Sequence, residues 1–332
     1  MKILLTGGTG YIGSHLAVRL LEIGHAVAIM DNLANSKKEV IGYIKEITGK
    51  KPDFFELDML DYDGVREVFG RENFDLVIHL AGLKSVKDSV IRPLEYYDNN
   101  VTGTINLLKC MQEYGVKRII FSSSATVYGD NGVNVVDETM ETGRNIANPY
   151  GRTKYMIEEI LKDVARADDS FEVILLRYFN PVGAHNSGLL GENPNNEPNN
   201  LMPVIMKVAS GEIPELQVYG DDYDTPDGSG IRDYIHVMDL VEGHVAAIQK
   251  LQPGVEVYNL GTGKGTSVLE MVKMFEKISE ETLPYKIVAR REGDLAEVIA
   301  DPSKANKELK WSAEHSIEDA ITDTLNYLRK RS

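Results

Sequence analysis

A tyrosine and a lysine lie four residues apart in the stretch NPYGRTK, residues 148–154. If a helix begins here, Asn148 is a suitable N-cap and Pro149 suits the first helical position. Tyr150 and Lys154 then project from one face, one turn apart, where the ammonium favours the phenolate that a general base requires. Holding a phenol with a free pKa of about 10 ionised near pH 7 requires about 4 kcal/mol of local stabilisation, more than one ammonium usually supplies. The pair therefore predicts a base only if a second positive group lies beside it.

Six short apolar runs alternate with helical patterns up to about residue 180. They are residues 2–6, 26–30, 53–57, 76–80, 118–122 and 172–178. Between them apolar residues recur every three or four positions, as in residues 11–24. Such alternation is typical of right-handed crossovers and of a parallel, doubly wound sheet. We therefore predict an α/β protein with a Rossmann-type nucleotide-binding domain over residues 1–180.

The composition of the chain changes at residue 181. Residues 181–200 are rich in Gly, Pro and Asn, which indicates a long loop, and shorter mixed elements follow it. Loops of this length in a compact protein are usually functional or disordered. We expect residues 181–332 to form a second, smaller α/β lobe that binds the substrate. The run VYNLGTG, residues 257–263, is a candidate for a strand that returns to the first lobe.

Composition narrows the classes of function. The 332 residues suffice for a large core, and the formal net charge of -15 disfavours nucleic acid as a partner, because counterion release needs clustered Lys and Arg. Cys110 is the single cysteine, so no internal disulfide is expected, which suits a reducing cytoplasm. The sequence suggests neither a signal peptide nor a membrane-spanning run. We expect a cytoplasmic enzyme without a membrane partner.

Three glycines lie between the first strand and the first helix. In TGGTGYIG, Gly7, Gly10 and Gly13 follow the pattern G-x-x-G-x-x-G. Such glycines permit a tight turn, a close approach of the backbone to a pyrophosphate, and close packing of helix on sheet. Asp31 ends the second strand about twenty residues later, where a carboxylate accepts hydrogen bonds from ribose hydroxyls and repels a 2′-phosphate. The pattern predicts a dinucleotide site that prefers NAD to NADP.

The next strands end in further polar or small residues, at the edge where an open parallel sheet binds its ligands. Asp58 follows the third strand, Leu80, Ala81 and Gly82 follow the fourth, and Ser122 to Ser124 end the fifth. The oxidised nicotinamide of NAD+ carries the second positive charge that Tyr150 needs, and reduction removes it. The strength of the base is thereby coupled to the redox state, as reversible alcohol oxidation requires.

The glycine pattern, Asp31, the serine run and the Tyr150/Lys154 pair together resemble the extended short-chain dehydrogenase/reductase superfamily. Over nearly its whole length the chain is similar to the UDP-galactose 4-epimerase family. The matching stretches are TGGTGYIGSH, DNLANS, HLAGLKSV, PLEYYDNNVTGT, FSSSATVYG, NPYGRTK, LLRYFNPVGAH, NNLMP, GIRDYIHVMDL, YNLGTG and RREGD. The resemblance implies an isomerase of nucleotide-sugar metabolism with tightly bound NAD.

The resemblance also implies a mechanism. Tyr150 removes the proton of the sugar 4-hydroxyl while the C4 hydride passes to NAD+, and Ser124 hydrogen-bonds the same oxygen. The 4-keto sugar then takes the hydride back on its other face, while Lys154 holds the nicotinamide ribose and tunes Tyr150. By matching positions, the family implies these further NAD contacts: Tyr11, Ile12, Asn32, Asn35, Ser36, Asp58, Met59, Lys84, Asn99 and Phe179.

Arginines on an acidic chain are candidates for binding the substrate's diphosphate. Arg232 and Arg291 supply guanidinium groups, which bind phosphate oxygens in pairs. The resemblance implies additional uridine, phosphate or sugar contacts: Asn180, Asn200, Leu201, Tyr219 and Asp294. We therefore expect a UDP-sugar as substrate, with Tyr219 as an aromatic wall beside the nucleotide.

Two alternative functions are weighed against epimerisation. NAD-dependent nucleotide-sugar 4,6-dehydratases share the Tyr/Lys chemistry but carry an Asp-Glu pair where this chain has Ala125 and Thr126. Neither side chain can act as an acid or base, so dehydration is disfavoured. A non-catalytic NAD-sensing protein on the same fold is the second alternative, and it would be expected to lack Tyr150, Lys154 or Ser124.

Val298 departs from a pattern within the family. Some members place a tyrosine that walls off the sugar after RREGDL, and this chain has Val298 at the matching position. A smaller side chain leaves room for an N-acetyl group at C2. We therefore hypothesise activity on UDP-N-acetylglucosamine and UDP-N-acetylgalactosamine as well, with a shifted loop that fills the space as the alternative.

Two helical stripes are candidates for a partner surface. They are Leu94, Tyr97, Val101, Ile105 and Leu108, and then Ile157, Ile160, Leu161 and Val164. Core packing against the sheet is the more common reason for such spacing. In the family, however, the corresponding helices pair across a dimer, so we expect a homodimer. The histidines show no spacing typical of a metal site, and no metal is expected.

Overall fold

A computed structural model describes residues 1–195, 197–198, 200–291 and 293–331. All six strands expected in the first half are present, with bounds that differ by at most two residues from the apolar runs. They are β1 (Lys2–Thr6), β2 (Ala26–Asp31), β3 (Asp53–Glu56), β4 (Leu76–His79), β5 (Arg118–Ser124) and β7 (Glu172–Tyr178). The helical segments among them are α1 (Tyr11–Glu22), α2 (Val40–Thr48), α3 (Tyr62–Arg71), α4 (Val86–Ile91), α5 (Pro93–Tyr96), the π-helix η1 (Tyr97–Thr102), α6 (Gly103–Glu113), the 3-10 helix η2 (Ala125–Tyr128) and α7 (Pro149–Ala167).

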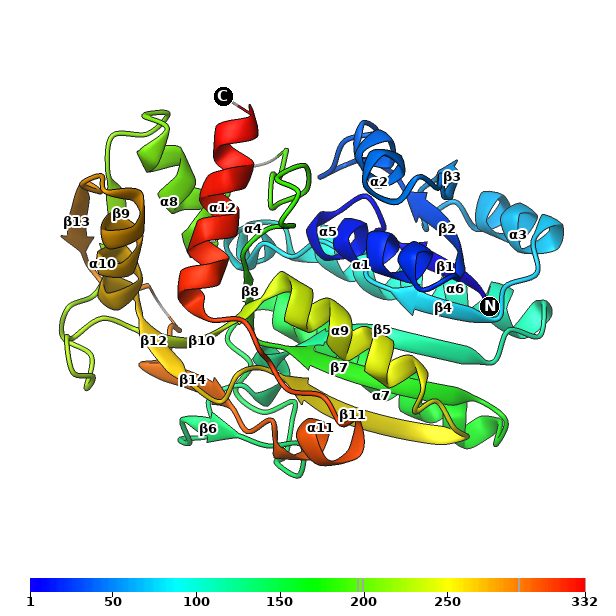
Figure 1. Ribbon diagram of the computed structural model, residues 1–332. Coiled ribbons are helices and arrows are strands. Elements are labelled where there is room, and N and C mark those ends of the chain that lie inside the picture. Colours follow the sequence, from blue (N-terminus) through cyan, green and yellow to red (C-terminus); the bar gives the residue numbers. More distant parts are fainter. Residues whose placement is uncertain (196, 199, 292, 332) are drawn as a thin grey trace.

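These strands belong to a seven-stranded parallel sheet in the order β11-β7-β5-β4-β1-β2-β3 (Figure 1). The order reverses between β1 and β4, which opens a crevice at the carboxyl ends of the strands, where doubly wound sheets bind ligands. The returning strand is β11 (Gly254–Leu260), and it pairs with β7 from Gly254 opposite Glu172 to Leu260 opposite Tyr178. The α/β, Rossmann-type fold and the return of this strand are confirmed.

Helices cover both faces of the large sheet. Ile3 and Leu5 of β1 face a core shared with α1 and α9 (Val237–Ile248), whereas Leu4 faces a core shared with α3, α6 and α7. Figure 1 shows α9 beside α1 on the same face, although the two helices are far apart in sequence. Burial on both faces explains why the strands are almost continuously apolar.

A buried ion pair joins α7 to the large sheet. Glu158 and Arg177 are 0% and 2% exposed, and the guanidinium donates from Nη2 to Oε2 at 2.7 Å and from Nε to Oε1 at 3.0 Å. The Ser123 hydroxyl donates to the same Oε1 at 2.5 Å, and the guanidinium also lies 4.7 Å from the centre of the Tyr128 ring. The pair therefore ties β5, β7, α7 and η2 together directly behind the strand ends.

The remaining chain builds a smaller lobe around β10 (Ile231–His236). Its mixed sheet contains β6 (Val135–Val136), β8 (Asn180–Val182), β12 (Gly265–Ser267) and β14 (Glu297–Ala300), and a two-stranded ribbon contains β9 (Leu216–Tyr219) and β13 (Tyr285–Val288). Its helices are α8 (Leu201–Ala209), α10 (Val268–Ser279) and α12 (Ile317–Arg331), which share one core, while α11 (Ser303–Glu308) packs on β11. None of the helices in the described ranges is long and apolar enough to cross a membrane.

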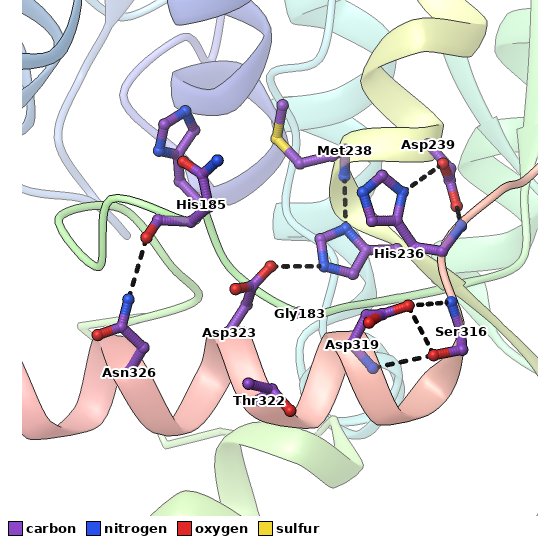
Figure 2. A network of polar contacts seen from close by, with 12 residues as sticks. Gly183, His185, His236, Met238, Asp239, Ser316, Asp319, Thr322, Asp323 and Asn326 are labelled. Atoms are coloured by element: carbon purple, nitrogen blue, oxygen red, sulfur yellow. Dashed lines mark hydrogen bonds and ion pairs between the residues drawn. The ribbon is translucent and has the colours of Figure 1, made fainter.

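Polar contacts hold the first half of α12 against the base of α9 (Figure 2). His236 Nε2 lies 3.3 Å from an Asp323 carboxylate oxygen, and its Nδ1 accepts from the N–H of Met238 at 3.1 Å. The Asp239 carboxylate accepts from the backbone N–H of His315 at 3.0 Å and meets its ring at 2.7 Å. The C-terminal helix is therefore fixed to the strand that carries Arg232.

Candidate active site

Helix α7 begins as its sequence predicts and places Tyr150 in the first turn. The Asn148 side chain accepts a hydrogen bond from the N–H of Gly151 at 2.9 Å, and Pro149 is the first helical residue. This N-cap is confirmed. The Lys154 ammonium, one turn later, lies 5.9 Å from the centre of the Tyr150 ring and donates to the carbonyl oxygen of Ser122 at 2.6 Å.

The chain alone keeps the Tyr150 phenol protonated. Burial raises the pKa of Tyr150 to about 12, although a hydrogen bond with the Ser124 side chain acts in the opposite direction. Burial also lowers the pKa of Lys154 to about 7, because an ammonium in this enclosed site has lost its water. Lys154 therefore does not create a phenolate at neutral pH by itself, and a further positive charge at the site is required.

The glycine turn packs closely against the β4 loop and the first helix only because side chains are missing from it. Gly7 has a φ of +72°, and a Cβ added there would lie 2.7 Å from the Ala81 nitrogen. A Cβ on Gly13 would lie 2.4 Å from the Gly7 carbonyl oxygen, so the helix could not approach the turn as closely. Helix α1 starts at Tyr11 after Gly10 with no side-chain cap over its first turn. This cradle fits the pyrophosphate of a dinucleotide, which binds to backbone N–H groups at a helix N-terminus.

Asp31 organises the loop that follows β2. Its carboxylate accepts from the N–H of Thr9 at 3.1 Å and from the N–H of Leu33 at 2.9 Å, and the Ser36 hydroxyl donates to it at 3.2 Å. These bonds hold the carboxylate at the edge of the cavity, facing the glycine turn. A fixed acidic group at this position fits the adenosine ribose of NAD and repels a 2′-phosphate.

A π-helical turn shapes the wall near the fourth strand, and the sequence did not predict it. Residues 97–102 form η1 between α5 and α6. Asn100 in this turn is buried, accepts from the N–H of Leu83 at 2.8 Å and donates to the Thr153 hydroxyl at 3.0 Å. Its neighbour Asn99 lines the cavity. π-helical turns of this kind are frequent at functional sites, and here the turn links the β4 loop to α7.

The two arginines expected to bind the substrate lie on the smaller lobe. Arg232 lies on β10, and its guanidinium is 3.5 Å from an Asp294 carboxylate oxygen and donates to the Ile231 carbonyl at 2.7 Å. The Arg291 guanidinium lies 3.8 Å from the centre of the Tyr219 ring. Both arginines therefore border a wall that also carries an aromatic ring, an arrangement suited to a nucleoside diphosphate.

One cavity of about 1830 Å³ is lined by all the residues expected at the cofactor and substrate sites. On the first lobe these are Gly7, Gly10, Tyr11, Ile12, Gly13, Asp31, Asn32, Asn35, Ser36, Asp58, Met59, Leu80, Ala81, Gly82, Lys84, Asn99, Ser122, Ser124, Tyr150, Lys154 and Phe179. On the other side they are Asn180, Asn200, Leu201, Tyr219, Arg232, Arg291, Asp294 and Val298. Ligand cavities are usually about 300–1,000 Å³, so this one has room for two ligands side by side. Asn199 of the NNLMP stretch and Glu292 of RREGD lie outside the described residues.

Glu192 is a residue of this site that sequence reasoning missed. It is 7% exposed, and its Oε1 accepts from the Lys84 ammonium at 2.6 Å and from the Asn200 amide at 2.8 Å. It thus joins an expected NAD contact to an expected substrate contact. A single acidic residue in a loop rich in Gly, Pro and Asn gives no periodic signal, so only the resemblance of the flanking motifs could have drawn attention to it.

Comparisons with known proteins agree with this geometry. Residues 3–261 match the family model described as the NAD dependent epimerase/dehydratase family. The chain is 53% identical over 326 residues to the UDP-glucose 4-epimerase of Bacillus subtilis, covering 98% of this chain and 96% of that protein. It is 50% identical over 330 residues to the one from Mus musculus, covering 97% and 95%. The crystal structure of UDP-glucose 4-epimerase from Bifidobacterium longum in complex with NAD+ and UDP superposes with a TM-score of 0.97 at 52% identity, covering 99% of this chain and 98% of that one.

Proposed function

Because the chain belongs to the NAD dependent epimerase/dehydratase family, we propose that it interconverts UDP-glucose and UDP-galactose by inverting C4 of the sugar. It is an isomerase, and NAD is its cofactor. The observation that carries the proposal is that Tyr150, Ser124 and Lys154 line the same cavity as both arginines of the smaller lobe. That cavity is large enough for a dinucleotide and a nucleotide sugar together.

The residues of the chain divide the chemistry among them. Tyr150 takes the proton of the 4-hydroxyl and later returns it, and Ser124 donates a hydrogen bond to the same oxygen. When bound, NAD supplies the hydride acceptor and donor. Lys154 is held by the Ser122 carbonyl with its Nζ 5.9 Å from the centre of the Tyr150 ring, and in its protonated form it adds positive charge near the phenol. The wide cavity leaves room for the sugar to turn about its diphosphate link and present its other face.

The lobes are assigned distinct tasks in this proposal. Residues 1–180 hold NAD, through the glycine cradle and Asp31. Residues 181–332 hold the UDP-sugar through Arg232, Arg291 and the Tyr219 ring, while α9 and β11 of this half complete the NAD-binding lobe. Asn180, at the boundary, is assigned to the substrate, and Ser124 and Tyr150 of the first lobe contact both NAD and the sugar in this proposal. The enzyme acts in the cytoplasm, which the single buried cysteine supports.

Dehydration is the less favoured chemistry. Ala125 and Thr126 lie in η2 beside Ser124, where the Thr126 hydroxyl donates to the Ser124 oxygen at 3.0 Å. No acid or base is therefore present at the two positions that a dehydratase uses to remove a proton and a hydroxyl.

The first experiment is the conversion of UDP-galactose to UDP-glucose by purified protein without added cofactor, with NADH absorbance followed in the same sample. We expect conversion without accumulation of NADH. Stoichiometric NADH formation would indicate a dehydrogenase, and a protein that binds NAD and UDP-sugar without turnover would indicate a sensor. Either result would refute the proposed function.

Val298 is proposed to admit N-acetylated sugars. It lies on β14 opposite Arg232, lines the cavity and packs against the cluster that contains Phe179 and Tyr128. In Val298→Tyr the larger ring should occupy the space beside C2. We expect turnover of UDP-N-acetylgalactosamine relative to that of UDP-galactose to fall by roughly 30-fold or more. Val298→Thr, which keeps the volume, should leave the ratio nearly unchanged, and an equal ratio in Val298→Tyr would disprove the steric role.

We propose a homodimer whose interface includes exposed apolar residues of α4 and α5. Of the two stripes, Leu108, Ile157 and Leu161 are buried in the core beneath the sheet, whereas Leu94 is 81% exposed. Ile91 is 67% exposed nearby. Leu94→Glu should therefore shift the protein from dimer to monomer in light scattering. A wild-type protein with the mass of a single chain at micromolar concentration would refute the dimer.

A further inference from the structure

Residues 186–195, here called the strap, run between β8 and α8 and lie between the C-terminal helix and the first lobe. They form neither helix nor strand. Gly191, Glu192, Asn193 and Pro194 are part of the cavity wall. The strap has no strand pairing, and it is held by Leu190, which is buried in the core of the large sheet, and by polar contacts with its neighbours.

On one side the strap is bonded to the loop that follows β2. The Asn195 amide donates to the Ser36 carbonyl oxygen at 2.9 Å and reaches the Leu33 carbonyl at 3.4 Å. This loop is the one that Asp31 organises. Three residues earlier, the Glu192 carboxylate binds the Lys84 ammonium at 2.6 Å. The strap thus closes over the cavity from the β2 loop to the β4 loop of the first lobe.

On its other side the strap is bonded to the last turns of α12. Asn326 donates to the Asn186 carbonyl at 3.0 Å, drawn in Figure 2 as the dashed line from Asn326, and Lys330 donates to the Ser187 carbonyl at 2.6 Å. Gly191 packs so closely on Tyr327 that an added Cβ would lie 2.6 Å from a ring carbon.

Arg331, in the last turn of α12, contacts both the strap and the first lobe. With the Asn193 amide oriented so that its oxygen faces the arginine, Nη2 donates to it at 3.0 Å. The guanidinium also lies 3.9 Å from a Glu39 carboxylate oxygen, just before α2 of the first lobe. Ala320, Ile321 and Leu325 of α12 are packed in the core of the smaller lobe, so the helix that bears these contacts is itself held in place.

We propose that the strap, supported by α12, retains NAD by closing the adenosine end of its site. The adenosine ribose belongs beside Asp31, in the loop that Asn195 holds to the strap. Release of that half of the cofactor requires the strap and the β2 loop to separate. Asn195 and Arg331 therefore control how long NAD stays bound, without touching the reacting atoms. This inference rests on NAD being the resident cofactor.

The test measures the rate at which NAD leaves the full-length holoenzyme. Protein loaded with radiolabelled NAD is mixed with excess unlabelled NAD, and the label retained after gel filtration is followed over time. We expect Asn195→Ala and Arg331→Ala each to speed loss of the label about five- to tenfold, the effect of losing one or two hydrogen bonds. Epimerase turnover at saturating NAD should stay within twofold of wild type.

Arg329→Ala is the matched control. Arg329 is exposed, lies two residues before Arg331 on the same helix, and borders a separate hollow with Leu325 and Leu328. This variant should lose label at the wild-type rate. If both Asn195→Ala and Arg331→Ala lose label at the wild-type rate, the strap does not retain NAD, although the proposed function would stand. A wild-type protein that takes up no NAD would overturn the proposed function and, with it, this inference.

Discussion

Replacing Tyr150 with phenylalanine should lower kcat for UDP-galactose by about 10²- to 10⁴-fold, the usual contribution of a positioned general base. The ring stays in place at the start of α7, and only the hydroxyl that exchanges the proton is removed. Retention of NAD and affinity for UDP should change by less than about twofold, because neither depends on the proton. Turnover is measured by coupled assay, and NAD content by extraction from the purified protein.

A matched variant separates the chemistry from a general disturbance of the helix. Tyr155→Phe removes a phenolic hydroxyl from the same helix, and we expect near wild-type turnover. The pH profile adds an independent test. Because the base acts only when deprotonated, wild-type kcat should rise with pH toward the pKa of Tyr150 in the loaded enzyme, and residual turnover of Tyr150→Phe should lack that rise. A Tyr150→Phe enzyme within tenfold of wild type would assign the proton transfer to another group.

Replacing Glu158 with alanine should lower the free energy of unfolding by about 3–5 kcal/mol, because it leaves the Arg177 guanidinium buried without its counter-charge. Both side chains are almost fully enclosed, so the guanidinium would stay away from bulk water after its carboxylate is lost. Urea unfolding followed by far-UV circular dichroism gives the change. Loss of the Glu158 contacts to β5 and β7 should also loosen the strand end that holds Ser124.

Two further variants make this expectation specific. Glu159→Ala removes the next acidic residue, which is half exposed and pairs with Lys162 at 2.8 Å on the surface, and it should cost less than about 1 kcal/mol. The double variant Glu158→Leu with Arg177→Met replaces the pair by apolar groups and should recover most of the stability. A Glu158→Ala protein as stable as Glu159→Ala would show that the pair contributes nothing to the fold.

The parts of the fold that could be predicted are those whose signals are local. The apolar runs, the glycine turn and the Asn148–Pro149 helix start each depend on residues adjacent in the chain, and all were confirmed. The return of β11 was suggested by a single motif. The pairing of Glu158 with Arg177 across 19 positions has no such signal, because it exists only once α7 has packed on the sheet.

In the candidate site, too, the sequence predicted local spacing but not the contacts that depend on tertiary packing. Four-residue spacing correctly placed Tyr150 and Lys154 on one face, but it could not show that the ammonium reaches the Ser122 carbonyl instead of the phenol. The positions of the strand ends and the family resemblance together predicted which residues line the cavity. The π-turn at Asn99 and Asn100 and the burial of Glu192 depend on tertiary packing, which no pattern in the sequence encodes.

The order of strands in the large sheet also has a consequence for how the protein is made. Strand β7 ends at Tyr178, but its neighbour β11 begins at Gly254, about 75 residues later. At a synthesis rate of about 5–20 residues per second, the ribosome needs roughly 4–15 s to deliver the partner strand. During that interval a nascent chain presents an unpaired, apolar β7 edge with the hydrogen-bonding groups that recruit other chains. Expression yield should therefore respond to chaperones that shield such edges, and translational pauses between these two strands should favour aggregation.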